Sequence, residues 1–462
     1  MIAAADLRAE LLRLVPDERR VNDGESVLDQ HAADLSYHAP HRPDIVVFPA
    51  STAEVSAVLA YANRAGVPVV PFGAGTSLEG HVIPLRGGIS LDLTRMNAIV
   101  TLRPEDLSVT VQPGVTRSEL EAAAGRHGLF FPVDPGADAT LGGMAATNAS
   151  GTTTVRYGGM RVNVLELEVV LAGGNVIRAG TRAVKSSAGY NLTNLFLGSE
   201  GTLGVITELT LRLHPIPECS VVARAAFPSV EAACAAGASL IGAGVLVTRC
   251  ELIDALTIGA MNAYKGTTFP EAPHLFVEFG GTSAAVAADL EAARELLEDE
   301  GASGFESVSD PTARSRMWDA RHNSLHASLA LAPGSRALTT DVAVPVSELA
   351  GAIEFGRTAL DESGLRGGIV GHVGDGNYHV AFLLDPDDTA SISKAEALNA
   401  RLVDDALARG GTCTGEHGIG FGKLDYLERE HGDLLPLMRG IKALLDPNGI
   451  MNPGKVIPGM SA

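Results

Sequence analysis

The chain has 462 residues, 46% of them hydrophobic and 19% charged, which is enough for roughly two or three well-packed globular domains. A formal net charge of −20 argues against binding to nucleic acid or to an anionic bilayer, because both would repel it. The four cysteines form no CxxC pair, and no secretory signal precedes them. No stretch reaches the ~20 apolar residues of a membrane span. We therefore expect a cytoplasmic protein.

The first half of the chain predicts a short-stranded β-rich domain. Residues 1–40 begin with a stretch of amphipathic helix, and a second helix is expected from Thr52 to Ala65. Short β-rich runs separated by glycine and proline then continue to Leu213: IVVF, VPVVPF, ISLDL, SVTVQPG, LELEVVLAGG and GVITELTLRL.

After Pro215 and Pro217 the pattern changes, and we place a domain boundary there. Strands VVARAAF, VLVTRCEL and LFVEFGG alternate with a helix from Ser229 and a long helix around 284–299. This order predicts an α+β domain with helices on one face of the sheet. The final segment, DPNGIMNPGKVIP, is apolar enough to dock back on the body of the protein.

Two glycine-rich segments have the composition of phosphate-binding loops: residues 71–80 and residues 135–151. Glycine lets backbone N–H groups approach an anion closely, and Thr or Ser adds hydroxyl donors. Neither segment matches the GxGxxG dinucleotide fingerprint, and an ordinary turn is the simpler interpretation of either one alone. The near-match to a P-loop at residues 449–455 is rejected, because Val456 replaces the metal-binding Ser/Thr and Pro453 interrupts the loop.

The segment GHVGDGNYH predicts a hairpin that could bind a metal. If Asp375-Gly376 form a two-residue turn, His372 lies directly opposite His379 on one face, at a spacing that suits two imidazoles on one ion. Glu416 offers a third ligand, and two His with one carboxylate leave positions open for substrate. The plainer alternative is a pair of strand histidines without any metal.

Together these segments resemble the D-lactate dehydrogenase branch of the FAD-binding family that shares the vanillyl-alcohol-oxidase (PCMH-type) fold. The resemblance covers about Pro43 to Val456. Its motifs are PFGAGTSLEG, FPVDPGADATLGGMAATNASGT, VRYGGMRVNVLELEVVL, KSSAGYNLTNLFLGSEGTLGVIT, ARHNSLHASLALAPG, TDVAVPV, GHVGDGNYH, GTCTGEHGIG and DPNGIMNPGK. It implies an α+β chain: a two-subdomain FAD-binding domain over 41–217, an α+β (ferredoxin-like) cap and metal domain over 218–445, and a tail over 446–462 that returns to the flavin.

The resemblance also implies the site residues. FAD would be bound non-covalently, although some members of the wider fold attach it near the position of His81. Its pyrophosphate would lie in the first glycine loop, its flavin end against the second, its adenine end near Gly201, and Asn452 would close over the ring. The full cofactor set is Pro71, Gly73, Ala74, Gly75, Thr76, Ser77, Pro135, Gly136, Ala137, Thr140, Gly142, Gly143, Thr147, Asn148, Gly151, Tyr157, Glu200, Gly201, Gly204, Val205, Ile206 and Asn452.

For the chemistry, the resemblance implies His372, His379 and Glu416 as ligands of a divalent Zn, Mn or Fe ion. His417 would be the base, and Arg321 would grip the substrate carboxylate, with Leu325 and Asn377 in the substrate pocket. The metal would acidify the hydroxyl of the substrate, and N5 of the flavin would accept the hydride from its Cα. We therefore expect oxidation of a small D-2-hydroxy acid, foremost D-lactate to pyruvate.

Two departures from related sequences bear on the choice of substrate. The hydroxyglutarate branch carries a lysine near the start of the segment written here Thr339-Thr-Asp341, and without that lysine a dicarboxylic substrate is disfavoured. Leu325 stands where animal D-lactate enzymes carry an aromatic residue, and the smaller side chain would admit a larger acid. The alternatives are a glycolate oxidase subunit, a metal-dependent hydrolase and a non-catalytic flavin- or metal-binding module. A quinone, a cytochrome, an electron-transfer flavoprotein or oxygen would each serve as electron acceptor. An acceptor in the membrane would hold the protein at the membrane periphery. A homodimer is the default oligomer.

Overall fold

The computed structural model describes residues 4–459, and the chain divides into two compact units. Unit 1 combines Met1–Gly151, Gly158–Ile216 and Glu416–Ala462, and unit 2 combines Thr152–Tyr157 and Pro217–Gly415. The passage into unit 2 falls beside the proline pair on which the sequence analysis placed a boundary. The return comes at Glu416, however, whereas residue 446 was expected, so the helices between these positions belong to unit 1.

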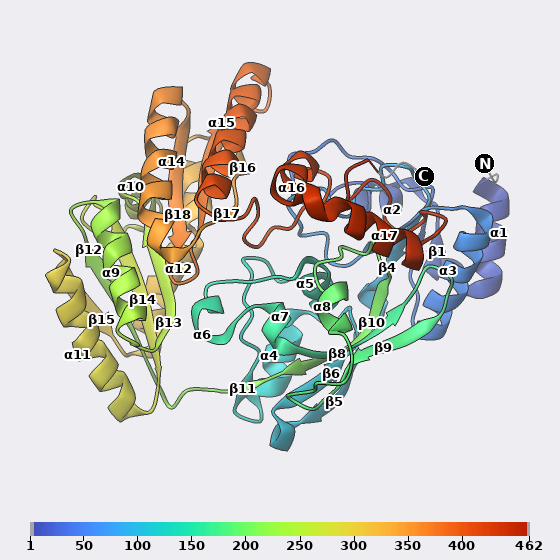
Figure 1. Cartoon of the computed structure of the whole chain (residues 1–462), viewed down its shortest axis with the longest axis horizontal. Coiled ribbons are helices and arrows are strands. Elements are labelled where there is room, and N and C mark those ends of the chain that lie inside the picture. Colours follow the sequence, from blue (N-terminus) through green and yellow to red (C-terminus); the bar gives the residue numbers. More distant parts are fainter. Residues whose placement is uncertain (1–3, 460–462) are drawn as a thin grey trace. The chain divides into compact units, whose positions relative to one another are not determined.

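Unit 1 contains two sheets and a two-stranded pair (Figure 1). In the first sheet, ordered β1-β2-β4-β3, the last three strands run parallel and β1 pairs antiparallel at the edge. The second, ordered β5-β6-β10-β8-β9, is antiparallel throughout. The strands are β1 (Val21–Asn22), β2 (Ile45–Val47), β3 (Val69–Phe72), β4 (Ile89–Asp92), β5 (Ile99–Arg103), β6 (Ser108–Val111), β7 (Leu129–Phe130), β8 (Val164–Val170), β9 (Val176–Gly180), β10 (Val205–Arg212) and β11 (His214–Pro215).

Helix α3 of unit 1 begins and ends where local sequence signals place it. Ser51 caps α3 through a hydrogen bond from Glu54 N, and Gly66 ends it at φ +66°, so the predicted bounds are confirmed. The helices are α1 (Ala4–Leu14), η1 (Glu18–Arg20), α2 (Glu25–Gln30), α3 (Thr52–Ala65), η2 (Leu93–Arg95), η3 (Pro104–Asp106), α4 (Arg117–Gly125), α5 (Leu141–Thr147), α7 (Met160–Asn163), α8 (Leu192–Phe196), α16 (Leu424–His431), η5 (Gly432–Leu434) and α17 (Leu435–Leu445).

Each sheet of unit 1 has its own core. One cluster, which includes Val109, Leu141 and Leu209, joins the antiparallel sheet to α4 and α5. The other includes Leu11, Val58 and Ile89, and it also contains Met451 from the last segment of the chain. Backbone of that segment pairs with β3 at Val69, so the predicted return of the tail is present within unit 1.

Unit 2 is built on one sheet of eight strands, all antiparallel, in the order β15-β12-β14-β13-β18-β19-β16, with β17 paired to β19. The strands are β12 (Cys219–Ala226), β13 (Val247–Ile253), β14 (His274–Gly281), β15 (Ser303–Val308), β16 (Arg336–Thr339), β17 (Val342–Ala343), β18 (Arg366–His372) and β19 (Asn377–Leu384). The helices are α6 (Thr154–Tyr157), α9 (Val230–Gly242), α10 (Ala255–Lys265), α11 (Ser283–Asp299), α12 (Pro311–His322), α13 (Ser324–Ala330), η4 (Val346–Glu348), α14 (Leu349–Ser363) and α15 (Thr389–Ala408).

Helices cover both faces of this sheet, so the prediction of helices on one face is wrong. Helices α11, α9, α14 and α15 pack side by side as one layer, whereas α10, α12 and α13 pack together as another. The two layers meet opposite sides of β18: a Cβ at Gly367 would meet Leu360 of α14, and a Cβ at the next residue, Gly368, would meet Thr257 of α10. Because adjacent strand residues point to opposite faces, the layers lie on opposite faces.

The β18–β19 hairpin forms as predicted, but in a different register. His372 pairs with Asn377 and Val370 with His379, so the loop has four residues, and its turn closes through Gly376 N donating to His372 O (3.1 Å). The register differs from the predicted one by two residues. A shift of two residues keeps every side chain on its own face, so both histidines still face the same side.

Among residues 4–459 no helix is long and apolar enough to cross a membrane. The four cysteines, Cys219, Cys234, Cys250 and Cys413, form no disulfide in this structure.

Candidate active site

One face of the unit 2 sheet collects the polar residues predicted for substrate and metal. Glu251 of β13 pairs directly with His372 of β18, and His372 with Asn377 of β19; His379 lies two residues further along β19 on the same face. This is the face covered by α12, because Arg321, in the last turn of that helix, reaches Glu251.

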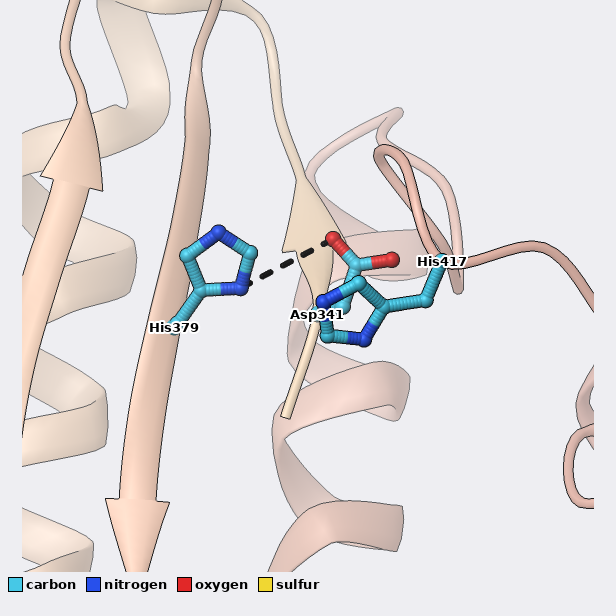
Figure 2. A group of neighbouring side chains, drawn as sticks. All are labelled: Asp341, His379 and His417. Atoms are coloured by element: carbon cyan, nitrogen blue, oxygen red, sulfur yellow. Dashed lines mark ion pairs between the residues drawn. The ribbon is translucent and has the colours of Figure 1, made fainter. Parts of the chain in front are cut away.

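The two histidines lie close together, with ring centroids 5.4 Å apart and planes at 84°. His372 Nδ1 lies 2.6 Å from Glu251 Oε1, and His379 Nδ1 lies 2.9 Å from the carbonyl oxygen of Thr340. Figure 2 shows the ring of His379 turned toward Asp341, whose Oδ1 lies 3.9 Å from Nδ1. With Nδ1 donating to an oxygen in both rings, Nε2 is the nitrogen that would bind a metal, which is the usual arrangement of metal-binding histidines.

Glu251 is fully buried and bridges an imidazole and a guanidinium. Its Oε2 accepts from Arg321 NH2 at 2.5 Å while its Oε1 faces His372. Burial is the largest influence and raises the pKa of this carboxyl, but His372 and Arg321 outweigh it, so the net pKa lies below its ordinary value. The carboxylate is therefore charged, and it orients both an imidazole and a guanidinium.

Asn377 forms hydrogen bonds within the protein that hold the site together. Its amide nitrogen donates to Asp341 Oδ1 and to the carbonyl of Val342, both at 2.8 Å. Thr414 Oγ1 donates to the other oxygen of Asp341 at 2.6 Å. The next residue, Gly415, lies against the same amide, because a Cβ there would come within 2.1 Å of Asn377 Nδ2. Unit 2 thus holds the chain in place up to the residue before Glu416.

Two further predicted site residues, Leu325 and Tyr157, belong to unit 2. Leu325 is the second residue of α13 and is 37% exposed, whereas Arg321 is 8% exposed. Tyr157, predicted to contact the cofactor, belongs to α6 in unit 2, where burial raises the pKa of its hydroxyl.

In unit 1 the predicted cofactor segments converge. A Cβ on Gly73 would lie 2.4 Å from Thr140 Oγ1, so the first glycine loop touches the start of the second at α5. A Cβ on Gly201 would lie 2.8 Å from Pro71, which brings the third segment to the same loop. Glycine at these positions allows three separate stretches of backbone to approach more closely than any side chain would permit.

The first glycine loop has the properties of an anion cradle. Among the described residues, no group accepts a hydrogen bond from the backbone N–H groups of residues 73–77. Buried or half-buried N–H groups are usually paired, and four of these five residues, all except the exposed Ala74, are half-buried. Unpaired N–H groups gathered in one loop suit a ligand with several acceptor oxygens. The pyrophosphate of FAD has that chemistry, and the residues present therefore fit the cofactor.

Three of the five described non-glycine residues with positive φ belong to the predicted cofactor segments. Asn148, Glu200 and Asn452 have φ values of +53°, +52° and +38°, in the left-handed region that residues other than glycine rarely adopt. All three belong to the predicted cofactor set, and strained backbone of this kind clusters at ligand sites.

The last segment of the chain is tied to this place by Glu200. Its carboxylate accepts from Ile419 N (2.7 Å) and Gly420 N (2.8 Å), and its backbone carbonyl accepts from Asn452 Nδ2 (2.7 Å). The same amide nitrogen donates to the carbonyl of His81 at 3.0 Å. His81 is buried beside Glu200, with Nε2 3.3 Å from Oε2, and no described residue forms a hydrogen bond with its Nδ1.

The predicted base, His417, lies in unit 1 beside the first glycine loop. Its Nδ1 is 3.7 Å from Oε1 of Glu79, and Lys423 Nζ is 3.4 Å from the same oxygen. Burial raises the pKa of Glu79 most, but Lys423 and His417 outweigh it and hold the net pKa below its ordinary value. A charged Glu79 therefore stands next to the imidazole of His417, at ion-pair distance from its Nδ1.

The sequence analysis missed Glu251, Asp341 and Glu79 as members of these clusters. Glu251 stands inside the strand run VLVTRCEL, and Asp341 precedes a short apolar run. An acidic residue within a buried strand is uncommon unless it is paired, and this signal could have drawn attention to Glu251. Its partners, His372 and Arg321, are 121 and 70 residues away and could not be identified from spacing.

Two family models match the chain. Residues 43–180 match the FAD binding domain, and residues 216–456 match the C-terminal domain of the FAD linked oxidases. Among solved structures, p-cresol methylhydroxylase with bound substrate aligns with a TM-score of 0.77 and 18% identity over 98% of this chain and 96% of that one. At this identity the likeness shows the fold, and it confirms the predicted PCMH-type α+β architecture.

Relatives of known name are similar along almost the whole chain. A probable mitochondrial D-lactate dehydrogenase of Danio rerio is 47% identical over 98% of this chain and 92% of its own length. The mitochondrial D-lactate dehydrogenase [cytochrome] of Arabidopsis thaliana is 43% identical over 98% and 80%. The glycolate oxidase subunit GlcD of Bacillus subtilis (strain 168) is 34% identical over 95% of both chains.

Proposed function

This chain belongs to the FAD-linked oxidases and is an FAD-dependent dehydrogenase, and on that premise we propose that it oxidises a small D-2-hydroxy acid, with D-lactate first, assisted by a divalent metal. The observation that carries the proposal is the sheet face on which Arg321, Glu251, His372 and His379 lie together. A guanidinium beside two imidazoles is a receptor for a carboxylate next to a metal-bound hydroxyl.

The metal would be held by Nε2 of His372 and His379 and by the carboxylate of Glu416. Support for Glu416 comes from the chain itself: Gly415 is fixed against Asn377, and consecutive Cα atoms are ~3.8 Å apart. Zn²⁺, Mn²⁺ and Fe²⁺ all accept two imidazoles and a carboxylate. A divalent ion supplies Lewis acidity at the substrate hydroxyl.

Residues of the chain perform the remaining tasks. Arg321 binds and orients the substrate carboxylate with a planar, permanently charged fork. His417 accepts the hydroxyl proton, and the charged Glu79 beside it stabilises the imidazolium that results. FAD, held by the unpaired N–H groups of residues 73–77 and by the segments that meet Gly73 and Gly201, supplies the acceptor for the hydride that leaves the substrate Cα.

A monocarboxylic substrate is favoured over a dicarboxylic one. The hydroxyglutarate branch carries a lysine near the start of the segment written here Thr339-Thr-Asp341. In this chain Thr340 Oγ1 accepts from Val380 N at 2.9 Å, and Asp341 accepts from Asn377 and Thr414. This segment offers no cation for a second carboxylate. The similarity to named D-lactate dehydrogenases agrees with the same choice.

The electron acceptor and compartment are part of the proposal. The word cytochrome in a relative's name favours a cytochrome acceptor over oxygen. Two of the relatives are named mitochondrial, so the cytoplasmic placement expected from cysteine usage is one of two options that fractionation of the native organism would distinguish.

The test is an anaerobic flavin spectrum of the purified protein, recorded with D-lactate or L-lactate, before and after treatment with a chelator. We expect the flavin bands to bleach with D-lactate only, and to bleach slowly once the metal is removed. Bleaching with glycolate in preference to D-lactate would favour the glycolate oxidase alternative. Bleaching that a chelator leaves unchanged would refute metal assistance, and a folded protein that takes up no FAD would refute the flavoenzyme.

A further inference from the structure

We propose that Glu251 is a positioning residue that couples the metal-binding His372 to the substrate-binding Arg321. This inference rests on the proposed function, because the roles of His372 and Arg321 belong to it. The carboxylate itself touches neither hydroxyl nor flavin in this proposal. It fixes the orientation of two groups that do the binding.

The position of Glu251 in the sheet makes the coupling direct. It stands opposite His372 in the β13–β18 pairing, so the two side chains share a face without any intervening residue. Both carboxylate oxygens are used, with Oε1 2.6 Å from His372 Nδ1 and Oε2 2.5 Å from Arg321 NH2. A fully buried carboxylate cannot turn to water, so each oxygen stays assigned to its own partner.

Two consequences follow for ligand binding. A carboxylate that accepts from Nδ1 fixes the tautomer of His372, directs Nε2 away from the strand and makes that nitrogen a stronger donor to a metal. The bond to Arg321 holds one arm of the guanidinium, so the fork is oriented before a substrate carboxylate arrives. His379 differs, because a backbone carbonyl holds its Nδ1.

Neighbouring residues supply a matched control. Glu278 of β14 is also a nearly buried carboxylate between two basic groups, with Oε2 2.8 Å from Arg249 NH1 and Oε1 3.6 Å from NH1 of Arg314 in α12. Arg249 of β13 pairs with Glu278 of β14, and β14 lies on the side of β13 away from β18. A change of Glu278 to glutamine therefore removes a comparable buried charge pair without touching His372 or Arg321.

The experiment measures Mn²⁺ binding to the chelator-treated holoenzyme by electron paramagnetic resonance, with Zn²⁺ binding measured by calorimetry. Glu251→Gln should weaken affinity 10–100-fold, as loss of a partner of a metal-binding histidine usually does, whereas Glu278→Gln should stay within about twofold of wild type. In a His372→Ala background, Glu251→Gln should cause no further loss. At saturating metal, the KM for D-lactate should still rise in Glu251→Gln, because Arg321 is released.

The outcomes separate this inference from the proposed function. Metal binding that is lost in His372→Ala but unchanged in Glu251→Gln would overturn the coupling and leave the proposed function standing. Equal losses of metal affinity in Glu251→Gln and Glu278→Gln would indicate a general structural role for Glu251 and would also overturn the proposed coupling. A wild-type protein that binds neither ion would refute the metal of the proposed function, and this inference with it.

A measurement on the wild type covers the case in which Glu251→Gln does not fold. ¹⁵N spectra of histidine-labelled holoenzyme with Zn²⁺ should show His372 protonated at Nδ1 and metal-bound at Nε2. The opposite assignment would refute the orientation by Glu251, because its carboxylate could then not accept from Nδ1.

Discussion

Replacing Gly376 with alanine should destabilise unit 2 far more than a replacement at another left-handed glycine. Gly376 has φ +80°, and a Cβ there would lie 1.9 Å from the carbonyl oxygen of Val344. Gly364, which ends α14 at φ +68°, has nothing within 4 Å of the same position. The two variants therefore share the backbone penalty and differ only in the clash.

The magnitude follows from three contributions. A left-handed alanine costs about 1–2 kcal/mol at either site. At Gly376 the forced displacement of packed backbone adds about 1–3 kcal/mol. Loss of the hydrogen bond from Val344 N to Gly376 O, 3.0 Å long, adds about 1 kcal/mol. Gly376→Ala should thus be less stable than Gly364→Ala by about 2–4 kcal/mol.

Urea unfolding followed by tryptophan fluorescence measures this difference. Trp318 is the one tryptophan of the chain and is buried in the core of unit 2, so its emission reports that unit. Linear extrapolation gives the free energy of unfolding for each variant. Equal values for Gly376→Ala and Gly364→Ala would refute the reasoning, because the contact with Val344 would then impose no constraint.

Three further predictions concern unit 1. Glu200→Ala removes the acceptor of two buried backbone N–H groups and should lower the free energy of unfolding by about 3–5 kcal/mol; a loss below 1 kcal/mol in urea titrations would contradict this. Gly73→Ala places a Cβ 2.4 Å from Thr140 Oγ1 and should weaken FAD affinity at least about tenfold. Gly125→Ala, where the added Cβ meets open space, should leave FAD affinity unchanged. Flavin fluorescence during reconstitution with FAD compares the two variants. Burial lowers the pKa of Lys455 to about 8 from 10.5, so between these values the unfolded chain binds more protons than the folded one. The free energy of unfolding of wild type relative to Lys455→Met should therefore increase as the pH rises through this window, and a constant difference would show that the amine is not buried in solution.

Local sequence signals were sufficient where the structure depends on neighbours in the chain. Ser51 and Gly66 bound α3 at the predicted residues, and Ser229 caps α9, because caps and left-handed glycines act within one turn. The hairpin of His372 and His379 was found for the same reason. Its register was wrong because Gly376 N bonds back to His372 O, and the contact of Gly376 with Val344 lies outside the hairpin.

Features that depend on distant contacts could not be read from spacing. Glu251 meets its partners only when β13, β18 and α12 assemble, and nothing near it in sequence marks it as part of a site. The return at Glu416 was placed too late because it is made by Glu200, more than 200 residues earlier, through Ile419 and Gly420. The cofactor segments, by contrast, were identified by resemblance and not by pattern.

The interrupted course of unit 1 has a consequence for how the protein is made. Unit 2 is complete in sequence by Gly415, so it can fold while the last stretch is still in the ribosome. The carboxylate of Glu200, translated much earlier, cannot accept its two hydrogen bonds until Ile419 and Gly420 have been synthesised. The backbone of Val69 likewise cannot pair before Met451 is present. We therefore expect nascent chains that have emerged from the ribosome only as far as residue 415 to display a finished unit 2 and a protease-sensitive unit 1. Flavin uptake should appear only once Asn452 has emerged.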